Sequence, residues 1–137
     1  MRVNLDILNS VVRAAEANEE FASAKLAAAI VKKNRIISFG FNSKKTHPFQ
    51  AKYARNDEAI YLHAEIAAIK NALRHISVDD LCYTTLYIAR VKKTAPFSNK
   101  LVWGLAKPCA GCARAISEFG IKNVVYTTNE HKVFECI

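Results

Sequence analysis

Short apolar runs typical of β-strands alternate with amphipathic segments typical of α-helices along the 137 residues of the chain. Apolar residues recur at helical spacing over residues 5–17, and two strand-like runs follow at residues 25–31 and 35–41. Residues 32–34, which are Lys, Lys and Asn, separate the two runs and favour a β-hairpin. This alternation predicts an α/β layer protein, in which one sheet carries helices on its faces.

The same patterns assign the rest of the chain, and Gly120 marks the end of the last predicted helix. In chain order we expect a polar loop over 42–57, a helix over 58–73, a strand over 83–91, an irregular segment over 92–108, a helix over 109–119, a strand over 121–128 and a short strand over 132–137. The sequence has neither an internal repeat nor a linker, so we expect a single domain over residues 1–137.

The composition indicates one folded domain in the cytoplasm. Hydrophobic residues make up 51% of the chain and charged residues 23%, which excludes disordered, collagen-like and low-complexity proteins. Four cysteines are too few for a disulfide-rich scaffold, and Asn4 and Asp6 interrupt any hydrophobic signal sequence. No window approaches the roughly 20 apolar residues of a membrane span. We therefore expect a cytoplasmic protein with reduced thiols and no membrane association.

Two short motifs carry the chemistry, and each stands at the start of a predicted helix. They are HAE at residues 63–65 and PCAGC at residues 108–112. Cys109 and Cys112, three positions apart at a helix N-terminus, place both sulfur atoms on one face, where the helix dipole favours thiolates. Together with the imidazole of His63 they provide three zinc ligands and leave a fourth tetrahedral position for water, as in catalytic zinc sites.

Glu65 is too close to His63 to be a convenient fourth ligand, but it can reach a water molecule on the metal. Its role would be to take the proton of that water and deliver it to a ring nitrogen and then to a leaving amine. A Cys-x-x-Cys motif on its own more often belongs to a structural zinc site or a redox pair. A His-x-Glu motif on its own is more often part of the exposed surface of a helix. A purely structural three-ligand zinc site is the main alternative, although it assigns no role to Glu65. Cys82 and Cys136 match no such pattern, and we expect both to be small buried residues.

The combination H-x-E…P-C-x-x-C is the known signature of zinc nucleobase deaminases, and the chain resembles the cytidine deaminase superfamily. The resemblance implies a three-layer α/β/α sandwich with a central mixed sheet of about five strands and a homo-oligomer of two or more chains. It also implies that His63, Cys109 and Cys112 bind zinc (Zn2+) and that Glu65 is the proton shuttle. The segments that carry it are the first helix, the hairpin, HAEIAAI, YTTLYIAR, PCAGCARAI and IKNVVYTT.

Basic residues flank both motifs. Residues 21–56 contain eight Lys or Arg and no acid, and residues 81–117 contain six and no acid. With a net charge of +8, this distribution favours a phosphate-bearing substrate, while any single one of these residues could equally be a solvated loop lysine or arginine. Asn42 ends a Gly-x-Asn sequence that resembles the one whose asparagine binds substrate in the family. The alternative is that the Asn42 side chain caps a turn. The residues predicted to contact substrate are Asn42, Lys44, Lys45, His47, Arg55, Ala64, Trp103 and Pro108.

The substrate branch stays open because the clues disagree. Because its first zinc ligand is a histidine, the chain resembles the deoxycytidylate, tRNA adenosine and polynucleotide cytidine branches of the superfamily. The segment over 92–107 is longer than in most of the families that the chain resembles. Phe97 and Trp103 within this segment suggest a lid or a base-stacking surface. The end of the chain is too short for the helix and parallel strand of the nucleotide branches, and a short returning strand would resemble the free-cytidine enzymes.

Our leading hypothesis is a zinc-dependent hydrolase that deaminates a small-molecule nucleoside or nucleotide (cytidine, deoxycytidine or dCMP) to the uracil form and releases ammonia. The first alternative is deamination of cytosine or adenine in single-stranded DNA or RNA, with the base flipped into the pocket. The second alternative is a non-catalytic zinc domain that binds nucleic acid through its basic face.

Overall fold

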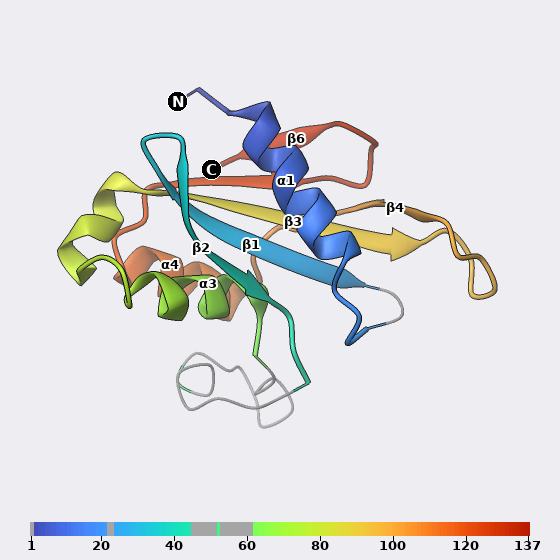
Figure 1. Ribbon diagram of the computed structural model, residues 1–137, viewed down its shortest axis with the longest axis horizontal. Helices are drawn as coiled ribbons and strands as arrows, with labels where there is room; N and C mark the ends of the chain where they lie inside the picture. The colour runs from blue at the N-terminus through green and yellow to red at the C-terminus, as the bar shows by residue number, and fades with distance from the viewer. Residues whose placement is uncertain (1, 22–23, 45–51, 53–61) are drawn as a thin grey trace.

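A mixed sheet of six strands forms the centre of the part of the chain that the structure describes (Figure 1). The computed structural model describes residues 2–21, 24–44, 52 and 62–137. The strands are β1 (Lys25–Lys32), β2 (Arg35–Phe41), β3 (Thr85–Lys93), β4 (Leu101–Gly104), β5 (Asn123–Thr127) and β6 (Phe134–Cys136). They lie in the order β2-β1-β3-β5-β6, and β4 pairs with β3. β3 and β5 run parallel, and the other described pairings are antiparallel.

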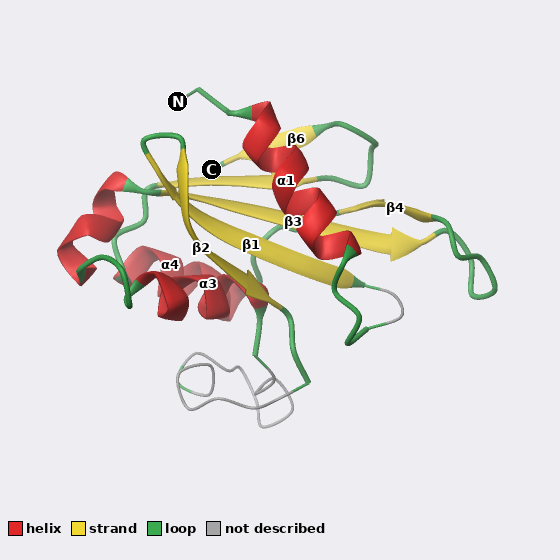
Figure 2. Cartoon of the chain, viewed as in Figure 1, coloured by secondary structure: helices red, strands yellow, loops and turns green. Residues whose placement is uncertain are grey.

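Helices cover both faces of the sheet, so the predicted three-layer α/β/α sandwich is confirmed (Figure 2). The α-helices of the described residues are α1 (Leu5–Glu16), α3 (Ala64–Ala72) and α4 (Ala110–Glu118). In β1, Ala28 and Ile30 belong to the core beneath α3 and α4, whereas Ala27 and Ala29 belong to the core beneath α1. Because both faces are covered, the middle parts of the central strands β1 and β3 are mostly apolar. No helix among the described residues is long and apolar enough to cross a bilayer.

Local sequence explains why the first elements form where they do. The side-chain oxygen of Asn4 accepts the backbone N–H of Ile7 at 3.2 Å and so caps α1. Lys33 and Asn34 adopt positive φ angles of 51° and 62°, which suit the tight turn between β1 and β2. The predicted β-hairpin is therefore confirmed.

Helix α3 is fixed against β2 by close backbone packing and two hydrogen bonds. Gly40 lies so near the helix that a Cβ atom there would overlap the α3 backbone. The hydroxyl of Ser38 donates to the carbonyl of Ala68 at 2.7 Å, and the side-chain amide of Asn71 donates to the carbonyl of Phe39 at 2.9 Å. These contacts hold the start of α3 at a defined place beside the sheet.

Element boundaries differ from the sequence prediction. Helix α3 begins at Ala64 and not at residue 58, because Leu62 and His63 are not helical, while residues 58–61 lie outside the described residues. A 3-10 helix, η2 (Val78–Tyr83), delays the start of β3 to Thr85. Strand β4 lies inside the segment predicted to be irregular, since four residues are too few to display a strand pattern.

The burial of the two cysteines outside the motifs also differs from the prediction. Cys136 is exposed, because it lies on the short strand β6 at the edge of the sheet. Cys82 is half-buried, and its thiol donates to the carbonyl of Asp79 at 3.2 Å. The expectation that both are buried is therefore wrong for Cys136.

Candidate active site

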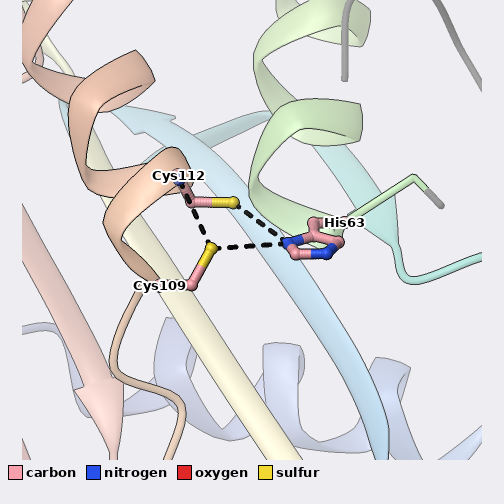
Figure 3. A group of neighbouring side chains, drawn as sticks. All are labelled: His63, Cys109 and Cys112. Carbon is pink, nitrogen blue, oxygen red and sulfur yellow. Dashed lines mark hydrogen bonds between the residues drawn. The ribbon is translucent and has the colours of Figure 1, made fainter. Parts of the chain in front are cut away.

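Three metal-binding side chains meet where α3 and α4 begin (Figure 3). The Nδ1 atom of His63 lies 3.2 Å from the Sγ atom of Cys112 and 3.7 Å from the Sγ atom of Cys109. All three donor atoms lie within 4.8 Å of one another. The structure thus brings the three predicted zinc ligands together, although His63 lies on a different helix from the cysteines.

The starts of the two helices position these ligands. His63 is the extended residue before α3, with φ −87° and ψ 153°. Cys109 occupies the same position before α4, and its Sγ atom accepts the backbone N–H of Cys112 at 3.4 Å. Ile66 packs against Cys112 and Ala115, which joins the first turns of the two helices. Cys109 therefore lies at the positive end of α4, where a thiolate is favoured.

Protons are unevenly distributed in this group when no metal is bound. Hydrogen bonds with Cys112 and His63 lower the pKa of the Cys109 thiol to about 3. The hydrogen bond with Cys109, followed by burial, raises the pKa of the Cys112 thiol. The hydrogen bond with Cys109 also raises the pKa of His63. Zinc requires two thiolates and a neutral imidazole, so its binding would release the proton of the Cys112 thiol.

The spacing and chemistry of these donors fit zinc. Zn–S bonds of about 2.3 Å and Zn–N bonds of about 2.0 Å place neighbouring ligand atoms of a tetrahedron roughly 3.5–3.8 Å apart. The observed distances of 3.2 and 3.7 Å from His63 Nδ1 to the two sulfur atoms need only small adjustments to match. Two cysteines and one histidine are also a ligand set of catalytic zinc sites, which keep a fourth position for water.

Glu65 is a buried carboxyl group in the first turn of α3, and its side chain is only 4% exposed. Burial raises the pKa of this carboxyl group above its ordinary value. Glu65 lines the same cavity as His63 and Cys109. A buried carboxyl group of raised pKa beside a metal site is suited to accepting and returning protons.

A cavity of about 260 Å³ opens at these residues. Its lining residues come from β1, from the position directly after β2, from the start of α3, from β3 and from the segment that precedes α4. The lining residues are Leu26, Asn42, His63, Ala64, Glu65, Arg90, Leu105, Ala106, Lys107 and Cys109.

The residues predicted to contact substrate are only partly gathered here. Asn42 and Ala64 line this cavity, and Lys44 lines a neighbouring cavity of about 470 Å³ that shares Asn42 and His63 with it. Pro108 precedes Cys109 in the chain but is not among the lining residues of either cavity. Three further predictions, Lys45, His47 and Arg55, lie outside the described residues.

The side chain of Asn42 is engaged mainly by the protein itself. Its Oδ1 atom accepts the backbone N–H of Leu26 at 2.9 Å and an N–H of the Asn18 side chain at 2.7 Å. Its Nδ2 atom donates to the carbonyl of Ala24 at 3.1 Å. These bonds tie Asn42 to residues distant in sequence rather than to its own turn, and they leave at most one amide N–H for a ligand.

The burial of Trp103 contradicts a base-stacking role. Strand β4 places its ring in the core beneath α1, where the residue is only 7% exposed and contacts the ring of His131 edge-on at 5.6 Å. The pairing of β4 with β3 decides this orientation, and the sequence prediction had no access to it. Phe97 is fully exposed but lines neither cavity at the metal ligands.

The structure also brings to the cavity two of the basic residues within 81–117 that favoured a phosphate-bearing substrate, together with apolar residues that the sequence did not single out. Arg90 and Lys107 line it, together with the apolar residues Leu26, Leu105 and Ala106. Arg90 belongs to the acid-free basic stretch of residues 81–117, and it is the single charge within the apolar run YTTLYIARV of residues 83–91. A charge at that position in a central strand calls for a partner.

Comparisons with known proteins agree with this site. A family model described as the cytidine and deoxycytidylate deaminase zinc-binding region matches residues 1–128. The crystal structure of dCMP deaminase from the cyanophage S-TIM5 in apo form is similar, with a TM-score of 0.53 and 21% identity over 90% of this chain and 84% of that chain. The structure of dCMP deaminase from the same phage in complex with dCMP and dUMP has a TM-score of 0.52 and 18% identity, over 91% and 83%. No curated protein sequence matches the chain.

The family match covers most of the chain and includes both motifs, HAE and PCAGC. At their low sequence identity, the two solved structures demonstrate a shared fold. The clustered His63, Cys109 and Cys112 offer a donor set of the kind that such a domain requires for zinc. The chain therefore belongs to the cytidine and deoxycytidylate deaminase zinc-binding family.

Proposed function

We propose that this protein is a zinc-dependent hydrolase that converts the cytosine of a nucleoside or nucleotide to uracil and releases ammonia. One observation carries the proposal: the buried carboxyl group of Glu65 lines the same cavity as the zinc donors His63 and Cys109. A structural zinc site needs no such group. We name deoxycytidylate as the first substrate to test, because one similar structure is a dCMP deaminase in complex with dCMP and dUMP.

The residues of the chain have distinct roles in this reaction. His63, Cys109 and Cys112 would hold the zinc ion, which supplies a water molecule whose pKa is lowered to about 7. The carboxylate of Glu65 accepts a proton from the attacking water and donates it to the ring nitrogen of the cytosine. Glu65 then passes the second proton of the same water to the amine, which departs as ammonia. One water is consumed, one C–N bond breaks and one C=O bond forms.

The environment of Glu65 suits this role. Burial raises the pKa of its carboxyl group above that of a solvated glutamate, so the group holds a proton more firmly. A group whose pKa lies near the working pH accepts and returns protons most effectively. The wall formed by Leu26, Leu105 and Ala106 adds apolar surface, which limits access of bulk water to the carboxyl group.

The first prediction tests Glu65 directly. Glu65→Gln should lower kcat for dCMP deamination by about 10²- to 10⁴-fold, because a glutamine cannot transfer the protons. Ammonia release from the zinc-loaded protein measures the rate, and metal analysis should find the zinc content unchanged. The matched control is Glu16→Gln, an exposed residue at the end of α1, which should keep the wild-type rate. Ammonia release at the wild-type rate from Glu65→Gln would remove Glu65 from the mechanism.

A second candidate function is deamination of cytosine or adenine in single-stranded DNA or RNA. It is favoured by a cavity of about 560 Å³ that Arg90, Lys92 and Lys93 line, and Arg90 also lines the cavity at the zinc donors. The same assay on single-stranded oligonucleotides decides between the two, since activity confined to oligonucleotides would replace our first proposal. Absence of ammonia from every substrate would favour a non-catalytic zinc domain that binds nucleic acid.

We also propose a cytoplasmic location and a homo-oligomer of two or more chains. The location rests on four free cysteines, which suit a reducing compartment. Sedimentation of the purified protein measures the assembly, and a monomer at micromolar concentration would contradict the second proposal.

A further inference from the structure

Arg90 is a half-buried cation whose guanidinium group is incompletely paired. Its Nε atom is buried and makes no hydrogen bond, and it is the one buried side-chain nitrogen or oxygen in the described part of the chain that lacks a partner. A buried donor on a charged group is costly to leave unpaired, so such a group points to a partner from outside the chain.

The backbone places the Arg90 side chain between two cavities. Arg90 lies on β3, directly opposite Gly104 on β4. A Cβ atom at Gly104 would lie 3.1 Å from both the Cγ and Cδ atoms of Arg90, so the arginine stem runs across the space that Gly104 leaves free. The side chain lines the cavity at His63 and Glu65 and also the adjoining cavity of about 560 Å³.

The charges around the adjoining cavity are of one sign. Lys92 and Lys93 line it together with Arg90, and no acidic residue is among its described lining residues. Lys92 is partly engaged, because its Nζ atom donates to the side-chain oxygen of Asn129 at 3.0 Å. A ligand that reached from the metal-binding side chains past Arg90 would therefore place its far end in a region whose charged lining residues are all cations, which favours an anionic group there.

We propose that Arg90 binds a phosphate group of the substrate while the base lies against the zinc donors. This inference rests on the proposed deaminase function and extends it to substrate selection. The planar guanidinium group donates two parallel hydrogen bonds to phosphate oxygens, which a lysine ammonium group cannot reproduce. Arg90 thereby makes the enzyme prefer phosphorylated substrates over free nucleosides. The phosphate is either the monoester of a free nucleotide or the diester of a strand.

The central experiment compares substrates with and without phosphate on zinc-loaded protein. We expect Arg90→Gln to lower the ratio of kcat/KM for dCMP over deoxycytidine by roughly 10- to 100-fold, the range for a lost charge-assisted pair. Arg90→Lys should recover only part of this ratio. The matched control is Arg35→Gln, which removes one exposed positive charge at the start of β2 and should leave the ratio unchanged.

A binding measurement makes the inference independent of activity. Calorimetry with dUMP, deoxyuridine and inorganic phosphate should give at least 10-fold weaker dUMP binding to Arg90→Gln than to wild-type protein, and loss of phosphate binding. If the wild-type protein deaminates neither dCMP nor deoxycytidine, the proposed function fails, and the binding of dUMP and phosphate still tests Arg90.

Oligonucleotides distinguish the two sources of phosphate. If the source is a strand, a methylphosphonate on the 5′ side of the target base should weaken the wild-type reaction and leave Arg90→Gln insensitive. Circular dichroism checks the fold of each variant, and Arg90→Lys carries the test if Arg90→Gln does not fold. An equal loss on phosphorylated and unphosphorylated ligands, or no loss on either, would overturn the inference.

Discussion

Glu65 combines two properties at the scale of a single residue: deep burial and a position beside three zinc donors. Burial removes its carboxyl group from water and is the largest effect on the pKa of the group, which it raises. Of the neighbouring charges, that of His63 lowers this pKa and that of Cys109 raises it. A group of this kind is useful in the reaction and costly to the fold. Active sites contain such destabilising groups because a group held ready to react cannot also be optimally solvated.

The cost of Glu65 predicts a pH-dependent stability difference in the metal-free protein. Its pKa in the folded protein is raised above the ordinary value of 4.5, so ionisation destabilises the fold as the pH rises from 4.5 through the raised pKa. Glu65→Gln cannot ionise, and its advantage in free energy of unfolding should grow over that window by about 1.4 kcal/mol per unit of pKa elevation.

Urea denaturation of both chelator-treated proteins between pH 4 and 8 measures this difference. The two proteins should be nearly equally stable near pH 4 and diverge above it. A difference that stays constant with pH would mean that the ionisation of Glu65 does not contribute to stability.

The decisive element is helix α3, because it begins directly after His63, carries Glu65 in its first turn and packs closely against β2 at Gly40. Seven of its nine residues are buried, so packing and not amphipathicity fixes its place. The hydrogen bonds from Ser38 and Asn71 tie it to the sheet. A shift of α3 would move both functional side chains together.

Gly40→Ala should produce such a shift. The new methyl group would meet the backbone of α3, including the carbonyl carbon of Ala67 at 2.7 Å, and backbone cannot yield as a side chain does. We expect a loss of about 3 kcal/mol in free energy of unfolding, at the upper end for overpacked cores, and a loss of zinc affinity.

The matched control is Gly104→Ala, whose methyl group would have the flexible Arg90 side chain as its nearest neighbour, at 3.1 Å. Thermal and urea unfolding compare the two variants, and the control should lose clearly less stability. Equal stability of Gly40→Ala and wild-type protein would mean that the contact between α3 and β2 relaxes freely.

The whole molecule is needed to assemble the zinc site, because its ligands come from two helices that are far apart in sequence. Strand β3 and the segment with β4 separate α3 from α4 along the chain, and the sheet brings the two helices side by side (Figure 1). The unfolded chain holds no preformed site, so zinc binding stabilises the folded state. Metal affinity and global stability are thus coupled.

Zinc should therefore raise the melting temperature. At a zinc concentration of about 100 times Kd the gain is about 2.7 kcal/mol, which for a domain of this size corresponds to a shift on the order of 10 °C. Cys112→Ser should abolish most of this shift, because it removes a buried zinc ligand. Cys136→Ser, which changes an exposed cysteine on β6, should keep it. Scanning calorimetry with and without a chelator measures both, and no zinc-dependent shift in wild-type protein would contradict the site.

Much of the candidate site could be predicted from the sequence, because the spacing of its ligands is local chemistry. Cys109 and Cys112 fall within one helical turn wherever α4 packs, and Glu65 follows His63 closely at the start of α3. The layered α/β fold was predictable for a similar reason, since the periodicity of apolar residues is written along each element.

Tertiary structure decided where the remaining side chains lie. Trp103 and Arg90 occupy the paired strands β4 and β3, yet the indole is buried beneath α1 whereas Arg90 lines the cavity at the candidate zinc donors. Asn42 lines that cavity while its amide bonds to residues 18, 24 and 26. The face of the sheet that a side chain occupies depends on strand register and on what packs above it. Both are set by contacts between residues distant in sequence, which no local pattern records.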